Sequence, residues 1–525
     1  MTAVLLQLDP ASSLPLYRQI LQQMRQLIST GALPAGERLP PSRELATRLG
    51  VHRTTVANAY AELAADGWIA GHVGRGTFVA ESPQATSTER SRGAKPSPEA
   101  APLPPYTARL DNGYLWPMLF ADNGSDDALE ALVSTHALAS DPRYVAFTLA
   151  RPAEELFPVE EFRRATSEVL RREGRALLQL GPSDGYPPLK DFLRAELRRE
   201  GIQAGERELL ITNGCQQALD LVRKVFLRPG DTVALENPVY PGAIQTFSSD
   251  GIQCLGVPVG ASGLNLDVLD TLLARHRVRL LLTTPSFHNP TGATLSLDAR
   301  KRLLEIVARH RVPVVEDNIY GALRLRGREL PTLKALDTHG LVIHLNSISK
   351  VCFPGLRVGW MVASAPVIER LRIAKQATDL HTDQLAQAAL AEFGRRGLVA
   401  RLIKKARQLY RVRLERLEAA LEAHFPEEAE WVRPEGGMAV WVRLPEGLDT
   451  SALLVKARER YVLFTPGRYF YFQGVEHNTF RLGFTAVAEK KIAQGIEILG
   501  ELIKSELRQR RRRAPAQRGA RVALV

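Results

Sequence analysis

A proline-rich stretch divides this chain of 525 residues into two parts of unequal length. Residues 81–105 contain six prolines and almost no large apolar side chain, so this stretch has too little apolar surface to join a folded core. A single core also stops growing at about 250–300 residues. We therefore expect a small domain over residues 1–80, a linker over 81–105, and a large domain over 106–507 whose first part, 106–146, forms an arm.

Positive charge is concentrated at the end of the sequence. The net charge is +12, and seven arginines within residues 508–525 supply more than half of it, with no acid after Glu506. A solvated, disordered tail explains this cluster more simply than contacts with nucleic-acid phosphates do, and we favour it. The charge of the whole chain therefore does not by itself indicate a nucleic-acid partner.

The composition excludes several classes of protein. No apolar run approaches the ~20 residues that a membrane-spanning helix needs, and the N-terminus lacks the basic start and apolar stretch of a signal peptide. The three cysteines, Cys215, Cys254 and Cys352, are an odd number at wide spacing, which is typical of reduced thiols rather than of disulfides or a metal site. We expect a cytoplasmic protein with no membrane partner and no bound metal.

The first eighty residues show the pattern of a helix-turn-helix. Apolar residues at helical spacing over 14–28 predict a packing helix. A short helix over 43–49, with Ser42 as a candidate N-cap, ends at Gly50, and a second helix over 52–66 has one apolar face. Two helices around a tight turn, the second presenting polar groups first, form the arrangement that enters the DNA major groove. The polar groups at the start of the second helix are Arg53, Thr54, Thr55 and Asn58.

A predicted hairpin follows these helices. Apolar residues alternate over 67–79, around a tip formed by Gly74, Arg75, Gly76 and Thr77. Such a wing suits contacts with the minor groove or the DNA backbone. A solvated face explains any one of the arginines taken alone, but it does not explain four ordered motifs at this spacing.

Residues 14–80 closely resemble the winged helices of the GntR family. The resemblance rests on the motifs at 39–46, 51–56, 66–69 and 74–77. It implies that Arg43, Arg53, Thr54 and Thr55 contact DNA and that the tip at 74–77 approaches a groove. The partner is then a double-stranded DNA operator, whose sequence stays open.

The large domain alternates helices with short apolar strands. Strands are predicted over 208–212, 232–236, 280–284, 312–316 and 341–345. This alternation predicts an α/β fold with a mostly parallel sheet covered by helices. Such sheets hold ligands at the carboxyl ends of their strands.

Lys350 lies in a sequence setting that suits a covalent bond to an aldehyde cofactor. An imine requires a free amine, and an apolar cleft beside Arg357 would lower the pKa of the lysine. Ser347, Ser349 and Arg357 suit a phosphate group, through hydroxyl and guanidinium contacts. A lysine that reaches the surface is the common alternative, and the flanking Ser-Ile-Ser and Pro-Gly-Leu-Arg disfavour it.

Other polar groups follow the predicted strands. Gly214, Cys215 and Gln216 open a helix whose free N–H groups suit a phosphate. Tyr240 offers a ring on which a pyridine can stack, although a lone tyrosine more often packs in a core. Asn289 lies in an Asn-Pro turn that can direct its amide at a phenolic oxygen. Asp317 suits a protonated ring nitrogen, with a helix N-cap as the alternative.

This ordered series resembles the fold-type-I aminotransferases, and the whole chain, from residue 14 to about 505, resembles the MocR group of GntR regulators. The resemblance implies a large fold-type-I domain that binds pyridoxal 5′-phosphate. Lys350 would form the internal aldimine, with Asp317 at the pyridine nitrogen, Tyr240 stacked on the ring, and Asn289 and Tyr320 at the phenolic oxygen. The groups at the phosphate would be Gly214, Cys215, Gln216, Ser347 and Arg357. Arg481 matches the arginine that binds a substrate carboxylate, with a structural salt bridge as the alternative.

Two positions depart from the family pattern. Leu180 stands where the family usually has a tyrosine that crosses the dimer interface toward the phosphate. Cys215 replaces a smaller residue, and a thiol beside a phosphate can be reactive.

Together these features predict a dimeric, pyridoxal-phosphate-dependent regulator that senses an amino compound by forming an external aldimine. A working aminotransferase with an accessory DNA-binding domain is the main alternative, because nearly all the catalytic groups are present. A sensor of the cofactor itself is a third. The effector, the operator and the sign of regulation stay open.

Overall fold

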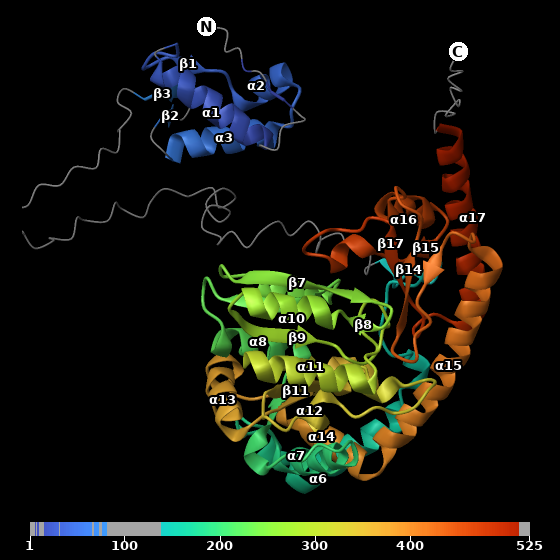
Figure 1. Cartoon of the computed structure of the whole chain (residues 1–525). Coiled ribbons are helices and arrows are strands. Elements are labelled where there is room, and N and C mark those ends of the chain that lie inside the picture. Colours follow the sequence, from blue (N-terminus) through green and yellow to red (C-terminus); the bar gives the residue numbers. More distant parts are fainter. Residues whose placement is uncertain are drawn as a thin grey trace, which may run out of the picture. The chain divides into compact units, whose positions relative to one another are not determined.

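The computed structural model describes residues 6, 8–9, 15–30, 32–65, 68–72, 76–80 and 138–513, which form two compact units (Figure 1). We call them the N-terminal unit and the large unit. The predicted linker, 81–105, and most of the predicted arm lie outside the described residues. No helix in the described part of the chain is both long and apolar enough to cross a membrane.

The N-terminal unit is a winged helix-turn-helix. Its three helices share one apolar core with a small antiparallel sheet, to which Ile20, Met24, Leu45 and Val56 contribute. Gly50 adopts φ +65° between the second and third helices, a conformation that glycine reaches without strain. The elements are α1 (Leu16–Ser29), β1 (Arg38–Leu39), α2 (Ser42–Leu49), α3 (Arg53–Ala65), β2 (Ile69–His72) and β3 (Gly76–Val79).

The prediction of Ser42 as an N-cap is wrong. Helix α2 already includes Ser42, Pro41 occupies the cap position, and no side-chain hydrogen bond caps the helix. Proline fixes φ near −65°, so Pro41 sets the direction in which the chain enters the helix without a capping side chain.

An eight-stranded, mostly parallel sheet forms the centre of the large unit. The five predicted strands are confirmed, and the second and eighth strands in the sheet order run antiparallel to their neighbours. In that order, the strands are β5 (Leu209–Thr212), β12 (Gly359–Val362), β11 (Val342–Ser347), β10 (Val314–Asp317), β9 (Val278–Thr283), β6 (Thr232–Asn237), β7 (Gln253–Gly260) and β8 (Gly263–Leu264).

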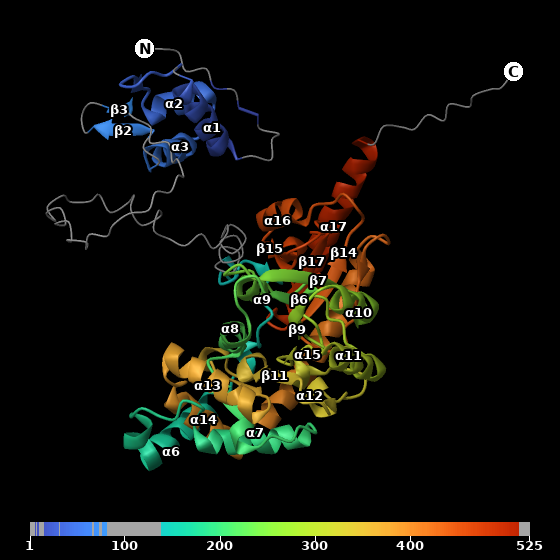
Figure 2. The same ribbon diagram turned by 60° about the vertical axis from the view of Figure 1, so that its left-hand side comes forward.

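Helices cover both faces of this sheet (Figure 2). Each face has its own apolar core, because the strands bury side chains on both sides. One core packs under α8 (Cys215–Phe226), α9 (Pro241–Phe247) and α13 (Ala365–Asp379). The other packs under α10 (Leu266–Arg275), α11 (Leu297–His310) and α12 (Leu333–Leu336).

The C-terminal part of the large unit adds a second, antiparallel sheet. Its order is β13 (Glu430–Trp431), β14 (Ala439–Arg443), β17 (Thr479–Gly483) and β16 (Thr465–Pro466). Long helices flank it: α15 (Leu398–His424), α16 (Thr450–Glu459) and α17 (Glu489–Arg513). The end of the predicted arm joins this part, because β4 (Val145–Ala146) pairs in parallel with β15 (Val462–Leu463).

The prediction of a disordered tail from residue 508 is wrong for residues 508–513. Helix α17 continues through Arg513, and the Arg510 guanidinium donates a hydrogen bond to the Glu446 carbonyl. Arginine is a good helix former, and the first proline after Glu489 is Pro515, so nothing in the sequence stops the helix earlier. Residues 514–525 lie outside the described part of the chain.

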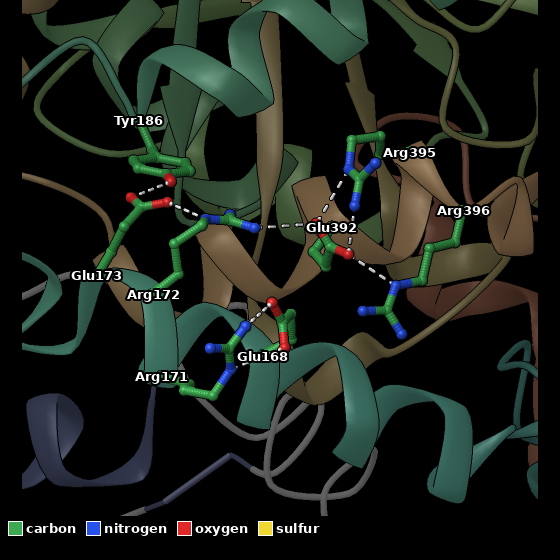
Figure 3. A network of polar contacts seen from close by, with 8 residues as sticks. All are labelled: Glu168, Arg171, Arg172, Glu173, Tyr186, Glu392, Arg395 and Arg396. Atoms are coloured by element: carbon green, nitrogen blue, oxygen red, sulfur yellow. Dashed lines mark hydrogen bonds and ion pairs between the residues drawn. The ribbon is translucent and has the colours of Figure 1, made fainter.

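A network of ion pairs and hydrogen bonds joins α6 to α14 and to the residue before α7 (Figure 3). The helices are α6 (Val159–Leu177), α7 (Pro187–Arg199) and α14 (Gln384–Arg395). The Glu392 carboxylate is buried and accepts hydrogen bonds from Arg395 and Arg396, while Arg172 lies 3.6 Å away on a different helix. Burial favours the neutral acid, but the arginines outweigh it and lower the pKa of Glu392 to about 2.

Candidate cofactor site and DNA-reading surface

The start of α3 carries the polar surface that the sequence predicts. Arg53, Thr54 and Asn58 are exposed, and Thr55 is half-buried. Arg43 is exposed on α2. The His52 ring, which sequence reasoning missed, lies 2.9 Å from the Thr54 hydroxyl through its Nδ1 atom and so orders the start of the helix.

Only part of the predicted wing tip falls within the described residues. Gly74 and Arg75 lie outside them, whereas Gly76 begins β3 and Thr77 pairs with Gly71 of β2. The antiparallel pairing of β2 and β3 confirms the hairpin.

In the large unit, a cavity of about 170 Å³ opens at the carboxyl ends of the parallel strands. It gathers side chains from positions as far apart in sequence as Arg151 and Arg357. The predicted residues that line it are Cys215, Gln216, Tyr240, Asn289, Asp317, Tyr320, Ser347, Ser349, Lys350 and Arg357. The remaining two contact this set, since Gly214 touches Arg357 and Arg481 bonds to Asn289.

One end of the cavity has the form of a phosphate cradle. Gly214 precedes α8 with φ +82°, and a Cβ atom there would lie 2.6 Å from Nη2 of Arg357. The same guanidinium nitrogen donates to the Asn213 carbonyl at 3.2 Å, which orients it beside the free N–H groups of the helix. The Ser347 hydroxyl donates to the Val358 carbonyl (2.8 Å) and lies 2.9 Å from the Ser349 hydroxyl. These donors form one cluster suited to an anion.

The Lys350 amine lies at the centre of the cavity. Its Nζ atom donates to the Ala150 carbonyl at 2.9 Å and lies 5.7 Å from the centre of the Tyr320 ring. Burial, followed by the positive charge of Arg481, lowers the pKa of Lys350 to about 8. About a tenth of this side chain is therefore a neutral, nucleophilic amine at pH 7, a far larger fraction than for an ordinary lysine.

Asp317 lies at the end of β10 with its carboxyl group in the same cavity. Burial raises the pKa of Asp317 to about 6, while a hydrogen bond from the Ile319 N–H to Oδ1 (3.1 Å) opposes that shift. The carboxylate thus remains mostly ionised at neutral pH. The alternative of a helix N-cap is wrong, because the next helical turn, η3 (Gly321–Leu323), has Tyr320 at its cap position. The contact with the Ile319 N–H is a local turn, and the second carboxylate oxygen takes no part in it.

Arg481 and Asn289 form a single unit. Nη1 of Arg481 donates to Oδ1 of Asn289 (2.9 Å) and Nη2 donates to the Thr148 carbonyl (2.9 Å). In the described part of the chain no carboxylate lies within ion-pair distance of Arg481, so the alternative of a structural salt bridge is wrong. The Nε atom of Arg481 and the Thr148 hydroxyl are buried without a hydrogen-bond partner among the described residues. A buried cation without a counter-ion is costly, and it suits an anionic ligand.

Sequence reasoning missed the residues that support the Asn289 turn. The buried Glu236 carboxylate accepts hydrogen bonds from the Thr283 hydroxyl (2.7 Å) and the Thr284 N–H (2.9 Å), and lies 3.2 Å from Nε2 of His288. Thr284 itself lines the cavity. Its place directly after a strand was the available signal, whereas nothing local marks Arg151 as a cavity residue.

The two departures from the family pattern have different outcomes. Leu180 is 71% exposed and lies in the loop after α6. Cys215 is buried, and burial raises the pKa of its thiol well above the ordinary value. Burial therefore favours the neutral thiol and opposes reactivity, because the thiolate is the reactive form.

Two family descriptions match this chain. Residues 150–499 match aminotransferase class I and II, and residues 16–79 match the bacterial regulatory proteins of the gntR family. Both units also occur together in full-length relatives. The chain is 32% identical to the HTH-type transcriptional regulator TauR of Rhodobacter capsulatus, over 93% of this chain and 96% of that protein. It is 30% identical to the probable rhizopine catabolism regulatory protein MocR of Rhizobium meliloti, over 94% and 95%.

The chain belongs to the MocR group of GntR regulators. Its large unit also aligns with a solved structure, LysN, the alpha-aminoadipate aminotransferase of Thermus thermophilus, in complex with N-(5′-phosphopyridoxyl)-L-leucine. The TM-score is 0.69 at 39% identity, and the match covers 75% of this chain and 99% of LysN. This MocR-type chain therefore combines a DNA-binding unit with an aminotransferase fold.

Proposed function

We propose that this chain is a pyridoxal-phosphate-dependent transcriptional regulator that responds to an amino compound with a carboxylate. The observation that carries the proposal is the grouping, in one cavity, of the Lys350 amine, the Asp317 carboxylate and the Arg481–Asn289 pair. These groups match, in order, an aldehyde, a pyridine nitrogen and an anionic ligand.

The chemistry of the donor set fits pyridoxal 5′-phosphate. The Gly214 cradle, with Cys215, Gln216, Ser347, Ser349 and Arg357, would hold the phosphate. Asp317 would hold a proton at the pyridine nitrogen. Asn289 and Tyr320 would face the phenolic oxygen, and Tyr240, a residue that is 40% exposed, would stack on the pyridine. When bound, the cofactor supplies an aldehyde for covalent attachment to an amine and a ring that accepts electrons.

The residues of the cavity then define how a ligand is recognised. The Nε–H of Arg481 is buried without a hydrogen-bond partner among the described residues, and with the second N–H of each Nη atom it would bind the carboxylate of the ligand. The amino group of the ligand would compete with the Lys350 amine for the aldehyde carbon of the cofactor. Lys350, once released, would be held by its hydrogen bond to the Ala150 carbonyl. A ligand shifts DNA binding only by its different affinity for two states of the protein, which is commonly 1–3 kcal/mol of coupling, or roughly 5- to 150-fold.

Absorbance and DNA binding measured on the same sample test this function. Amino compounds are added to the holoprotein with its promoter fragment, and the cofactor spectrum is followed together with DNA affinity. We expect a spectral change and a change in DNA affinity at the same ligand concentration. A spectral change without any change in DNA affinity, across a panel of amino compounds, contradicts the sensor. A response of the cofactor-free protein to pyridoxal phosphate alone indicates a cofactor sensor instead.

A working aminotransferase is the second candidate, because ten of the predicted groups line the cavity, the other two contact them, and the fold matches LysN. Incubation with an amino donor and a keto acid separates the two functions. Sustained turnover at about 1–1000 per second favours the enzyme. A single conversion that stops after one equivalent favours the sensor.

We further propose that the chain acts as a homodimer. Leu178 and Leu180 are exposed by 79% and 71% in one loop, and Leu380, at the end of α13, is exposed by 55%. The loop packs against the start of α14, because a Cβ atom on Gly181 would touch the Gln384 side chain. Three exposed leucines on neighbouring segments suggest a protein interface. The molar mass measured by light scattering after size exclusion tests the homodimer, and the mass of a monomer at micromolar concentration contradicts it.

A further inference from the structure

The edge of the large sheet opposite the cofactor cavity is rich in arginine. Strands β6, β9 and β10 run parallel and begin at this edge. The register places Thr232 beside Val278, and Leu281 beside Val314, so the segments that enter the three strands lie next to one another. Neighbouring strands are about 4.8 Å apart, which brings the side chains of these segments onto one surface.

The same five residues, Ala-Arg-His-Arg-Val, occur twice at this edge. Residues 274–278 connect α10 to β9, and residues 308–312 connect α11 to β10. Both helices pack on the same face of the sheet. Each copy therefore places its arginines where a helix ends and a strand begins.

Helix dipoles explain only part of this charge. Arg275 and Arg309 lie in the last turns of α10 and α11, where a cation offsets the negative helix end. Arg228 and Arg277 lie beyond the last turns of α8 and α10, Arg311 is the C-cap residue of α11, and all three are exposed. A second explanation is needed for these three side chains.

Ion pairs do not neutralise the edge either. Arg309 pairs with Asp270 at 3.1 Å, Lys224 pairs with Asp220 at 2.8 Å, and Arg279 lies 3.8 Å from Asp231. Among the residues that the structure describes, no carboxylate lies within ion-pair distance of Arg228, Arg277 or Arg311. These three guanidinium groups are left with unbalanced positive charge.

The surface is also hollowed at this point. An open hollow of about 690 Å³ is lined by Lys224, Arg228, Arg277 and Arg279, with Asp231 as its single acid. Its lining is mostly polar, unlike the apolar lining of most sites for drug-sized molecules. Guanidinium groups bind phosphate oxygens in pairs, so the chemistry favours a ligand that presents several phosphates.

We propose that this arginine edge (Arg228, Arg277, Arg279 and Arg311) binds the phosphate backbone of double-stranded DNA outside the segment read by the N-terminal unit. Duplex DNA carries one charge per about 1.7 Å and matches a row of arginines, of which Arg228, Arg277 and Arg311 have no ion-pair partner among the described residues. DNA that is bound by the N-terminal unit is present at high local concentration near the large unit of the same chain, because one polypeptide links the two units. The contact is independent of base sequence, since it involves phosphates only. It rests on DNA binding by the N-terminal unit and does not depend on the sensing of an amine.

The test compares two full-length double variants with the wild-type holoprotein. One removes the edge charges, Arg277→Gln with Arg311→Gln. The matched control, Arg401→Gln with Lys404→Gln, removes two exposed cations of α15 that also lack an ion-pair partner among the described residues. The DNA probes are a mixed-sequence duplex of about 60 base pairs and one of about 20 base pairs, which spans only two half-sites. Affinity is measured by fluorescence anisotropy over a range of salt concentrations.

We expect the edge variant to reduce the slope of log affinity against log salt by about 2 on the long duplex, since each phosphate contact contributes about 0.9. At about 0.1 M salt this lowers affinity by roughly 60-fold, because each of the two phosphate contacts contributes about eightfold. The short duplex and the control variant should show wild-type slopes. An unchanged slope on the long duplex overturns the proposal, as does an equal loss in the control variant or on the short duplex.

Unfolding measurements provide a second arm with inorganic phosphate as the probe. The edge variant should keep the cofactor spectrum and unfolding temperature of the wild type, because both substituted side chains are exposed. If inorganic phosphate stabilises the wild type but not the variant, while the DNA slopes are equal, the hollow binds small anions only and the proposal is wrong. Failure of the amine response leaves these slopes unaffected, so the two proposals fail separately.

Discussion

The two functional surfaces of this chain use charged and polar side chains in opposite ways. On the N-terminal unit, Arg43, Arg53 and Asn58 are exposed and fully hydrated. In the cofactor cavity, Lys350 and Arg481 are held among other polar groups, and burial lowers the pKa of both. Salt screens the interactions of exposed charges and affects those of buried charges much less, whereas burial shifts the pKa of a titratable group such as Lys350.

This difference indicates how a single chain keeps two binding events separate. Salt should control binding at the DNA-reading surface and leave the cavity almost unaffected. Protons should control the cavity and leave the arginines of the DNA-reading surface unaffected, because arginine stays charged at all accessible pH values. The following predictions test that separation, from the largest expected effect to the smallest.

Replacing Lys350 by alanine should abolish the absorbance band of the covalently bound cofactor. The cavity then lacks the amine that forms the bond, while the DNA-reading surface is unchanged. Absorbance spectra and DNA binding in the absence of an effector check both parts. Lys404→Ala, at an exposed position of α15, is the matched control and should keep the band. A band that persists in Lys350→Ala would show that another lysine holds the cofactor.

Replacing Arg481 by lysine should weaken binding of an amino acid by about 2–3 kcal/mol, or roughly 30- to 150-fold. Lysine keeps the charge but cannot make the forked contact, and it leaves Oδ1 of Asn289 without its donor. Spectral titration with an amino acid measures the loss. An amine of the same size without a carboxylate is the control ligand. If both ligands lose affinity equally, Arg481 acts on the cavity as a whole rather than on the carboxylate.

Attachment of pyridoxal phosphate to the cofactor-free protein should depend on pH with a midpoint near the pKa of Lys350, about 8. The pKa lies below the ordinary value for lysine, so the reactive amine appears as pH rises through this range. The rate should increase about 50-fold from pH 6 to pH 8, because the free-amine fraction increases by that factor. Stopped-flow absorbance measures it at low and high salt. A midpoint above pH 10, or one that moves strongly with salt, would contradict a buried amine.

Replacing Arg53 by alanine should reduce the salt slope of DNA binding by about 0.9 and the affinity by roughly eightfold at about 0.1 M salt, if it contacts a phosphate. The cofactor spectrum should not change. Arg401→Ala removes an exposed charge from the large unit and serves as the control. Equal DNA affinities of Arg53→Ala and wild type would place the reading surface elsewhere.

Local patterns were sufficient for most elements of this fold. The apolar spacing and Gly50 predicted α1 to α3, and five apolar runs predicted the parallel strands, because each of these signals acts within a few residues. The order of the strands in the sheet was not predictable, since it depends on contacts between distant segments. The helical structure of residues 508–513 was missed because a cluster of like charges is compatible with both a helix and a disordered tail.

The residues of the cavity were found where family motifs mark them, and their partners were not. No local signal links Asn289 to Arg481, which follows it by 192 residues, or Lys350 to the Ala150 carbonyl. The rise in the pKa of the Cys215 thiol could not be predicted either, because a sequence shows which group is present but not how far its surroundings exclude water. The roles of these residues toward a cofactor stay predictions.

The hydrogen bond between Arg481 and Asn289 has an optical consequence. If Asn289 faces the phenolic oxygen of the bound cofactor, as we propose, a shift of its amide should change the absorbance spectrum of the cofactor. A ligand carboxylate that binds the Arg481 guanidinium would weaken its hydrogen bond to Asn289 and shift the Asn289 amide, even when the ligand has no amino group. Simple fatty acids or keto acids should therefore cause a small shift in cofactor absorbance without forming a covalent bond. Binding of an anion at Arg481 could then be followed without an added dye.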